Sequence, residues 1–313
     1  MKTVLLSQMI HQKALEMLNG KFNVLVPSEK GQEAFDLLVD QANAIILRTN
    51  VKVTGDTIKR AKNLEIICRT GVGVDNIDLA AAKEAGVMVC NTPRANNISV
   101  AEHTIAMALA LVKCLPKYDD AVRHGNWLIR SEGKPTELFE KTVGIIGLGN
   151  IGRHVAAMFY NGFSMDVVAF DPCVKQEDFP EYTITDDVKD VFKKADILSV
   201  HCPSLPSTRG IINRENLALC KQGTIFINCA RGDIMVEDDV VYALEQGILL
   251  AAGLDVSAEE PIRPDSPLIH MDNILLTPHS AALTQEATIR MATTAVRQAL
   301  LYFDNNRPEF IVQ

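Results

Sequence analysis

The sequence lacks closely spaced cysteines, an excess of positive charge and any long apolar run. Its seven cysteines include no C-x-x-C or other close pair. This favours reduced, buried thiols in a cytoplasmic protein over disulfides, a catalytic thiol or a metal site. The formal net charge is −8, and the lysines and arginines are scattered along the chain. No basic face for nucleic acid is therefore expected.

The sequence also shows no apolar segment typical of a membrane span or of a targeting signal. The longest apolar helix-like stretch, residues 101–114, carries Glu102, His103 and Lys113. It is shorter than the roughly 20 residues that a bilayer requires. The first residues turn polar too early for a signal peptide. We therefore expect no membrane partner, and we interpret 101–114 as a buried helix.

The length and the pattern of short apolar runs predict two α/β domains. A chain of 313 residues exceeds the size at which one hydrophobic core usually stops growing. β-rich runs alternate with helical periods in both halves, which predicts two doubly wound parallel sheets. The runs are 4–6, 24–26, 44–47, 65–68 and 87–90, then 143–146, 167–170, 197–201, 224–228, 251–256 and 274–277. The spacing Ser99-x-x-Glu102 predicts a capping box at a helix start, and residues 284–305 have the period of a final amphipathic helix.

A glycine-rich motif follows the first run of the second half. It consists of Gly147, Leu148, Gly149, Asn150, Ile151 and Gly152, and it precedes a helical stretch. Glycine at its three positions permits a tight turn, close approach of a pyrophosphate and close packing of helix on strand. The start of the helix offers free N–H groups to an anion. This strand, loop and helix predict a dinucleotide site.

An acidic residue stands where the ribose of a dinucleotide would bind. Asp171 ends the next run, 19 residues after Gly152, which is close to the spacing of about 20 seen in dinucleotide-binding domains. Its carboxylate would accept the ribose hydroxyls and repel a 2′-phosphate. Pro172 and Cys173 follow it, rather than arginines. The sequence therefore predicts NAD, not NADP, as the cofactor.

Three polar residues follow later runs, at the strand ends where open α/β sheets bind their ligands. They are Arg231, Glu260 just before Pro261, and His279 just after Pro278. Each residue type alone is common in ion pairs or in structural roles. Their shared position after a dinucleotide loop makes them candidates for catalysis.

In this order and spacing, the three residues resemble those of the D-isomer-specific 2-hydroxyacid dehydrogenase family. Residues 68–78 (CRTGVGVDNID), 91–93 (NTP) and 101–103 (AEH) carry the same resemblance, which covers nearly the whole chain. The resemblance implies a flavodoxin-like substrate domain at 1–97 plus 284–313 and a Rossmann NAD-binding domain at 98–283. It also implies a cleft between the domains.

The resemblance gives the three candidates separate tasks in moving a hydride between NAD and C2 of a D-2-hydroxy acid. Arg231, a planar and permanent cation, suits the substrate carboxylate and its oxo group. His279 would exchange the proton of that oxygen. Glu260 would orient the imidazole ring and favour its charged form, with Glu259 as an alternative.

Further contacts follow from the resemblance alone. It implies cofactor contacts by His201, Pro203, Thr208, Ala230 and Asp255, and substrate-carboxylate contacts by the N–H groups of Val72 and Gly73. A homodimer is expected through the helix from Ser99 and the loop of Trp127. The sequence departs from the family pattern directly after His279, where Ser280-Ala281-Ala282 replaces an early glycine.

Within the family, the members that act on 3-phosphoglycerate and 3-phosphohydroxypyruvate are the most similar. Arg48 and Arg69 stand where those enzymes carry cations for the substrate phosphate, and two arginines suit a dianion. The alternative is that both arginines pair with protein carboxylates. The chain ends at Gln313, so we expect no serine-sensing extension and no serine feedback through one.

Two other functions stay open at this point. The nearest is a reductase for hydroxypyruvate, glyoxylate or a branched 2-keto acid. The other, from a different class, is an NAD-binding corepressor that shares the fold and acts by binding protein partners. A formate dehydrogenase is disfavoured, because the resemblance would then require glutamine at the position of Glu260.

Overall fold

The structure, a computed structural model, describes residues 1–132 and 135–313. These residues form two compact units, Met1–Asn96 together with Leu283–Gln313, and Asn97–Ala282. The chain therefore leaves the first unit once and returns to it at the end. Both crossings lie one residue before the boundaries that the sequence predicts.

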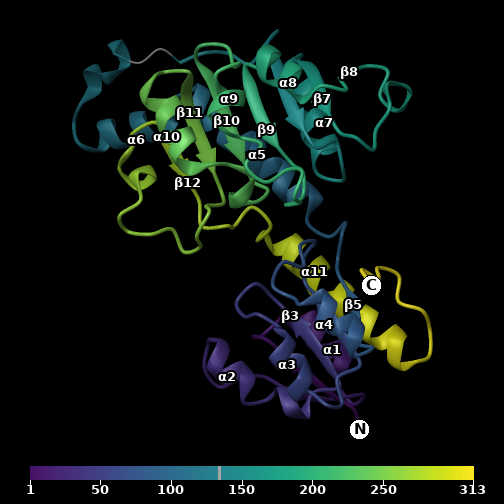
Figure 1. Ribbon diagram of the computed structural model, residues 1–313. Helices are drawn as coiled ribbons and strands as arrows, with labels where there is room; N and C mark the ends of the chain where they lie inside the picture. The colour runs from purple at the N-terminus through teal and green to yellow at the C-terminus, as the bar shows by residue number, and fades with distance from the viewer. Residues whose placement is uncertain (133–134) are drawn as a thin grey trace. The chain divides into compact units, whose positions relative to one another are not determined.

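The first unit is built on a five-stranded parallel sheet in the order β2-β1-β3-β4-β5. The sheet belongs to the purple and blue part of the chain that includes the N-terminus (Figure 1). Its strands are β1 (Thr3–Leu6), β2 (Asn23–Leu25), β3 (Ala44–Leu47), β4 (Ile66–Arg69) and β5 (Met88–Cys90). Each predicted run matches one of them to within a residue. The order is that of flavodoxin-like folds, and the predicted α/β class is confirmed.

Helices cover both faces of this sheet, because successive side chains of each strand point to opposite faces. Ile45 and Leu47 of β3 pack in one cluster with Phe35 and Ile58, while Ile46 packs on the other face. The helices of the first face are α2 (Gln32–Asp36), α3 (Gly55–Arg60) and α4 (Leu79–Glu84), with the short 3₁₀ helix η1 (Val39–Gln41).

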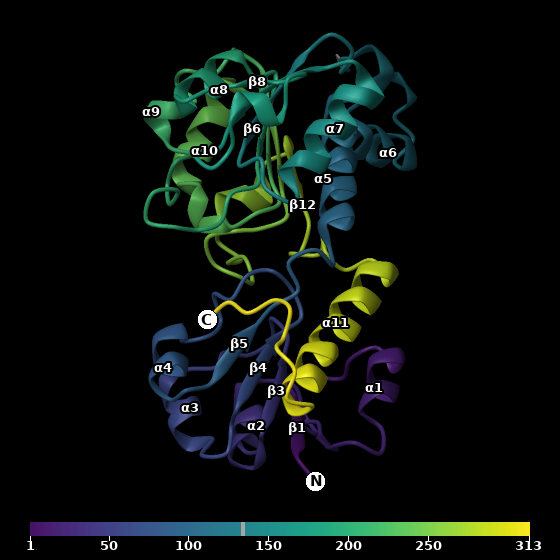
Figure 2. The ribbon, with the colours of Figure 1, turned by 90° about the vertical axis from the view of Figure 1, so that its right-hand side faces the viewer.

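The opposite face is covered by α1 (Gln12–Leu18) and by the last helix of the chain, α11 (Gln285–Phe303). Small and branched side chains of α11, Ala292, Ala295, Val296 and Ala299, pack with Val4 and Leu6 of β1. Figure 2 shows α11 lying beside α1 against the first sheet. The Thr284 hydroxyl caps α11 by accepting the Ala287 N–H at 3.2 Å, as its residue type favours.

The second unit holds a seven-stranded parallel sheet in the order β12-β11-β10-β9-β6-β7-β8. Its strands are β6 (Thr142–Ile146), β7 (Asp166–Phe170), β8 (Thr183–Ile184), β9 (Ile197–Val200), β10 (Thr224–Asn228), β11 (Leu249–Leu254) and β12 (Ile274–Leu276). Counted along the chain, this is the Rossmann order 3-2-1-4-5-6 with one strand added. The sequence misses β8, because a two-residue edge strand has no periodicity to detect.

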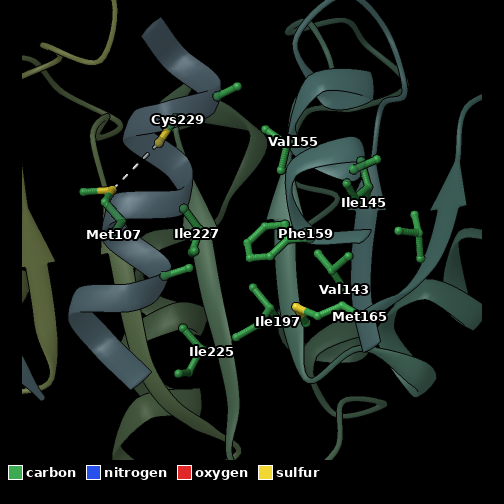
Figure 3. Packing of buried hydrophobic residues seen from close by; sticks show 14 of the residues in the cluster. Met107, Val143, Ile145, Val155, Phe159, Met165, Ile197, Ile225, Ile227 and Cys229 are labelled. Atoms are coloured by element: carbon green, nitrogen blue, oxygen red, sulfur yellow. Dashed lines mark hydrogen bonds between the residues drawn. The ribbon is translucent and has the colours of Figure 1, made fainter. Parts of the chain in front are cut away.

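Two helices bury the core on one face of this sheet. Figure 3 shows Met107 of α5 (Asn97–Val112) and Phe159 of α7 (Gly152–Phe163) among strand residues such as Ile145 and Ile227. α8 (Val188–Lys194) and α10 (Glu237–Glu245) cover the other face. The remaining helices are α6 (Leu115–Arg123), α9 (Arg214–Leu217), and the 3₁₀ helices η2 (Trp127–Ser131), η3 (Gln176–Asp178), η4 (Gly232–Ile234) and η5 (Pro267–His270).

The predicted capping box at Ser99 is wrong. Helix α5 begins at Asn97, so Ser99 lies within its first turn. The Ser99 hydroxyl instead donates a hydrogen bond of 2.5 Å to the carbonyl of Ala281. A partner distant in sequence has therefore replaced the local cap.

No single helix in the described part of the chain is long and apolar enough to cross a membrane. Helices α5 and α6 meet the length and composition criteria only as a pair bent by 60°. The same residues contain no group of three or more His, Cys, Asp or Glu side chains that could hold a metal ion.

Candidate active site

The glycine motif connects β6 to α7 through a turn that leaves no room for side chains. Gly147 has φ of +96°, and a Cβ there would lie 2.6 Å from the Cys202 nitrogen. A Cβ on Gly152 would lie 2.0 Å from the Gly147 oxygen, whereas one on Gly149 would meet open space. The turn therefore brings its backbone close to the residues that follow β9 and keeps the Gly149 side open.

Asp171 lies directly against this turn. One oxygen of its carboxylate accepts the Leu148 N–H at 2.9 Å, and the other accepts the Cys173 N–H at 2.9 Å. The first bond joins the end of β7 to the glycine motif, and the second is local to the turn after β7. At the start of α7, the N–H groups of Ile151 and Gly152 have no hydrogen-bond acceptor among the described residues. The loop and the acid thus form one region with free donors beside a carboxylate, as a dinucleotide requires.

The residues after β9 use their polar groups inside the protein. His201 Nε2 lies 2.8 Å from the Ser199 hydroxyl, and burial lowers the pKa of the His201 imidazole to about 3. The ring is therefore neutral at physiological pH. Thr208 donates to the Pro203 carbonyl at 2.6 Å and accepts the Leu205 N–H. These bonds shape the loop after β9, and the structure assigns no ligand contact to these side chains.

Arg231 is held in place by a buried amide at the end of β10. Asn228 is fully buried, accepts the Ala230 N–H at 2.9 Å and donates to the Arg231 carbonyl at 2.9 Å. A Cβ on Gly232 would lie only 1.9 Å from the Ser257 oxygen. The loop that carries Arg231 therefore touches the loop that leads to Glu260.

Glu260 and His279 form a direct pair. The Nδ1 atom of His279 lies 2.7 Å from a Glu260 oxygen, and both side chains are partly exposed. The pKa of the Glu260 carboxyl lies below its ordinary value. Burial acts to raise it, but the hydrogen bond and charge of His279, the Ser257 N–H and the charge of Arg231 together outweigh burial. Glu259 does not compete for the histidine, since it lies 3.9 Å from Arg263 in an ion pair.

The pair determines which ring nitrogen of His279 can exchange a proton with a ligand. A carboxylate only accepts hydrogen bonds, so Nδ1 of His279 carries a proton. Nε2 is then the ring atom that can give or take a proton from a ligand. Arg231 acts on the pKa of Glu260 through its charge, so one cation, one acid and one imidazole gather on the ends of neighbouring strands.

Asp255 lies beneath the histidine, in a role that the sequence does not predict. Its carboxylate, only 1% exposed, accepts the N–H groups of Ser280 at 2.8 Å and Ala281 at 3.0 Å. The Thr277 hydroxyl donates to the same carboxylate at 2.5 Å. Asp255 thus holds the segment that carries His279. No local pattern could reveal these bonds, because the partners lie more than twenty residues away.

In the first unit, Arg48 follows β3 and is half-buried beside a neutral partner. With its amide in the better orientation, Gln8 accepts from Nη1 of Arg48 at 2.8 Å and from Nε at 3.2 Å. No ion pair to a carboxylate involves Arg48 within residues 1–132 and 135–313. Burial lowers the pKa of the guanidinium, yet an arginine stays charged at any physiological pH. The alternative that Arg48 pairs with a protein carboxylate is therefore wrong.

Arg69 is the last residue of the neighbouring strand β4, where it pairs with Leu47 of β3, and Val72 and Gly73 follow that strand. The Arg69 side chain is largely buried, donates to the Thr70 carbonyl and lies over Gly71. The N–H groups of Val72 and Gly73 have no acceptor among the described residues. Two cations and two free N–H donors therefore stand on adjacent strand ends of this unit.

Comparison with known proteins agrees with this arrangement. Residues 105–281 match the family model described as D-isomer specific 2-hydroxyacid dehydrogenase, NAD binding domain. A D-3-phosphoglycerate dehydrogenase of Methanocaldococcus jannaschii is 38% identical over 95% of this chain and 57% of its own length. A hydroxypyruvate reductase of Thermotoga maritima is 37% identical over 92% of this chain and 94% of its own. The chain thus spans about half the length of the curated phosphoglycerate dehydrogenases that it matches.

Solved structures give the same result for the fold. A protein from Thermus thermophilus superimposes with a TM-score of 0.91 and 31% identity, covering 99% of this chain and 100% of that one. A glyoxylate reductase from Paecilomyes thermophila superimposes with a TM-score of 0.88 and 27% identity, covering 99% and 98%. The chain belongs to the D-isomer specific 2-hydroxyacid dehydrogenase family and carries its NAD-binding domain.

Proposed function

We propose that this protein is an NAD-dependent oxidoreductase acting at C2 of a D-2-hydroxy acid and its 2-oxo acid. The observation that carries the proposal is the 2.7 Å pair of His279 and Glu260, next to the loop of Arg231. The pair lies within the unit whose sequence matches the NAD-binding domain of the family.

The residues present suit NAD. The open side of Gly149 and the free N–H groups at the start of α7 suit a pyrophosphate. Asp171, fixed against Leu148, suits the ribose hydroxyls and would repel the extra phosphate of NADP. When bound, NAD supplies or accepts the hydride.

The three polar residues then divide the remaining work. In the direction of reduction, His279 donates the Nε2 proton to the oxo oxygen, and in oxidation it takes the hydroxyl proton. Glu260 holds the ring by Nδ1 and balances the charge of the imidazolium. Arg231 binds the carboxylate and polarises the oxo group, aided by the N–H groups of Val72 and Gly73.

For the substrate we propose 3-phosphoglycerate and 3-phosphohydroxypyruvate, which would assign the protein to serine biosynthesis. Arg48 supports this, because among the described residues its half-buried guanidinium contacts a neutral amide and no carboxylate, so the buried charge lacks an anion. Arg69 on the adjacent strand end adds a second cation for a dianion. Several relatives bear the name D-3-phosphoglycerate dehydrogenase.

A second candidate is reduction of an unphosphorylated acid, such as hydroxypyruvate, glyoxylate or a branched 2-keto acid. It is favoured by the hydroxypyruvate reductase of Thermotoga maritima, which this chain matches over 94% of that protein's length. The two candidates share every residue of the second unit and differ in what Arg48 and Arg69 bind.

Oxidation of NADH in the presence of phosphohydroxypyruvate, hydroxypyruvate, glyoxylate, pyruvate and branched keto acids tests both candidates. We expect the highest kcat/KM with phosphohydroxypyruvate. Replacing Arg48 by Ala should lower kcat/KM for that acid by roughly 10- to 100-fold, the value of one charge-assisted contact, and leave hydroxypyruvate within about twofold. Equal losses for both acids would refute the phosphate role, and no turnover with any acid would refute the enzyme. Arg60→Ala, which removes an exposed arginine of the same unit that pairs with Asp40, is the matched control.

We also infer a homodimer. Helix α6 buries none of its residues and exposes Leu115 and Val122, and Trp127 and Leu128 of η2 are exposed beside it in the chain. Four large apolar side chains within a short surface segment are typical of an interface. A second copy of the chain is the partner that the family resemblance implies.

A cytoplasmic location completes the proposal. All seven cysteines are free thiols, and four of them are buried. Burial raises the pKa of Cys90 and Cys229 to about 12, which keeps these thiols protonated and unreactive. Such cysteines suit a reducing compartment.

A further inference from the structure

The backbone at His279 adopts a conformation that its residue type does not favour. Its φ is +50°, in the left-handed region that costs free energy for any residue with a Cβ. Such a residue keeps this conformation only where its surroundings fix it. Its N–H donates to the Asp255 carbonyl at 2.8 Å and to the Thr277 carbonyl at 3.0 Å, and the next two N–H groups bind the Asp255 carboxylate.

The Asp255 carboxylate is itself held by a chain of side chains. The Thr277 hydroxyl donates its only proton to Asp255 Oδ1 at 2.5 Å. It must therefore accept the bond from Nε2 of His103, 3.1 Å away. His103 lies on α5, and its Nε2 is also 3.7 Å from the same Asp255 oxygen. The order of donation is thus His103 to Thr277 to Asp255.

Helix α5 contacts the histidine segment at a second point. The Ser99 hydroxyl donates to the Ala281 carbonyl, one helical turn before His103. Ala281 also gives its N–H to Asp255. The segment from Thr277 to Ala281 is therefore fixed on one side by the buried Asp255 and on the other by α5.

We propose that His103 and Thr277 are positioning residues, which act through Asp255 to fix the backbone at His279 and hence the direction of its Nε2. The inference rests on the proposed function for its effect on catalysis. The effect on the rate should be large, because a small displacement of a reacting group from its productive position lowers the rate by a large factor.

Replacement of Thr277 by Val keeps the shape of the side chain and removes the hydroxyl. We expect kcat for reduction to fall at least about tenfold, while the dissociation constant of NADH, measured by fluorescence, changes less than twofold. Thr277→Ser restores the hydroxyl and should recover kcat to within about twofold of the unaltered protein. A loss in Thr277→Val that serine does not recover, or one that follows NADH affinity, would overturn the proposal.

His103→Phe should lower kcat in the same direction, and the double variant with Thr277→Val should be no worse than Thr277→Val alone, because His103 acts through the hydroxyl. Full additivity of the two losses would contradict the order of donation. Thr104→Val is the matched control, since the Thr104 hydroxyl donates to Val100 of its own helix and also contacts Cys229, and within the described residues it makes no bond to the segment from Thr277 to Ala281. This control should keep kcat within about twofold.

Amide hydrogen exchange, followed by mass spectrometry, measures the same effect without catalysis. In Thr277→Val, the peptide that contains Ser280 and Ala281 should exchange faster, while peptides of α7 exchange as in the unaltered protein. Unchanged exchange at Ser280 and Ala281 would sink the positioning role even if kcat falls. If the unaltered protein reduces none of the acids, the proposed function fails, and this measurement still decides the positioning role.

Discussion

At the scale of single residues, the site depends on charges that are balanced locally. Glu260 accepts a hydrogen bond from Nδ1 of His279, and Glu259 forms an ion pair with Arg263. The lowered pKa of Glu260 means that the pair is more stable when the acid is ionised. Its contribution to stability is complete above the ordinary carboxyl pKa and is lost as the pH falls through the lowered value.

Replacing Glu260 by Gln should therefore change the pH dependence of catalysis. Without the carboxylate the imidazolium is less favoured, and reduction needs that form to donate its proton. We expect kcat/KM for reduction to fall by about tenfold or more at pH 8 and by less at pH 6. Initial rates between pH 5 and 9 provide the measurement.

The neighbouring variant Glu259→Gln is the control for this profile. Its carboxylate is exposed and pairs only with Arg263 in the part of the chain that the structure describes, so its profile should match that of the unaltered protein. A Glu260→Gln profile displaced by the same factor at every pH would show that the acid does not govern the charge of His279.

At the scale of elements, the loops of the site are fixed to one another by backbone contacts. Gly232 follows Arg231 and lies so close to Ser257 that a Cβ would overlap its carbonyl group. Arg231 directly precedes Gly232 on one side of this contact, and Glu260 follows three positions after Ser257 on the other side. A glycine here therefore sets the separation of two functional side chains.

Replacing Gly232 by Ala should force the two loops apart. We expect a stability loss of about 1–3 kcal/mol and a larger relative loss of kcat/KM, because Arg231 and Glu260 move. Thermal unfolding and NADH oxidation measure the two effects. Gly162→Ala is the control, since a Cβ there meets nothing within 4 Å, and it should keep both stability and activity. A Gly232→Ala protein with ordinary kinetics would contradict the account.

Elements with a regular pattern are predicted well from the sequence. Every strand of the first sheet is predicted to within a residue. β8 is missed because two residues carry no period. The start of α5 is misplaced because Ser99 bonds to Ala281, 182 positions away.

The residues of the site also divide into those that have a local sequence signal and those that have none. The glycine motif and the strand-end residues Arg231, Glu260 and His279 have local signals, namely spacing and flanking glycine or proline. The contacts that hold His279 have none, because His103 and Thr277 are 174 positions apart. A fold must be known before such residues can be singled out.

At the scale of the whole molecule, the surface of α6 and η2 predicts association. Leu128 is 73% exposed, and in a homodimer it would be covered. We expect sedimentation to give a dimer for the unaltered protein and a monomer for Leu128→Glu, because a buried charge without a partner is costly. Leu37→Glu is the control, as Leu37 is 77% exposed on the first unit, and it should stay dimeric. A dimer that survives Leu128→Glu would remove η2 from the interface.

The return of the chain to its first unit sets an order on synthesis. The sheet of that unit is complete in sequence by Cys90, but one of its faces is covered by α11, which begins at Gln285. Val4 and Leu6 therefore remain uncovered by α11 until the entire second unit and then Ala295 and Val296 have been translated. The second unit, continuous in sequence, can fold while it leaves the ribosome. The first unit is thus begun first and completed last. During synthesis, its uncovered strands are the ones that we expect a chaperone to bind.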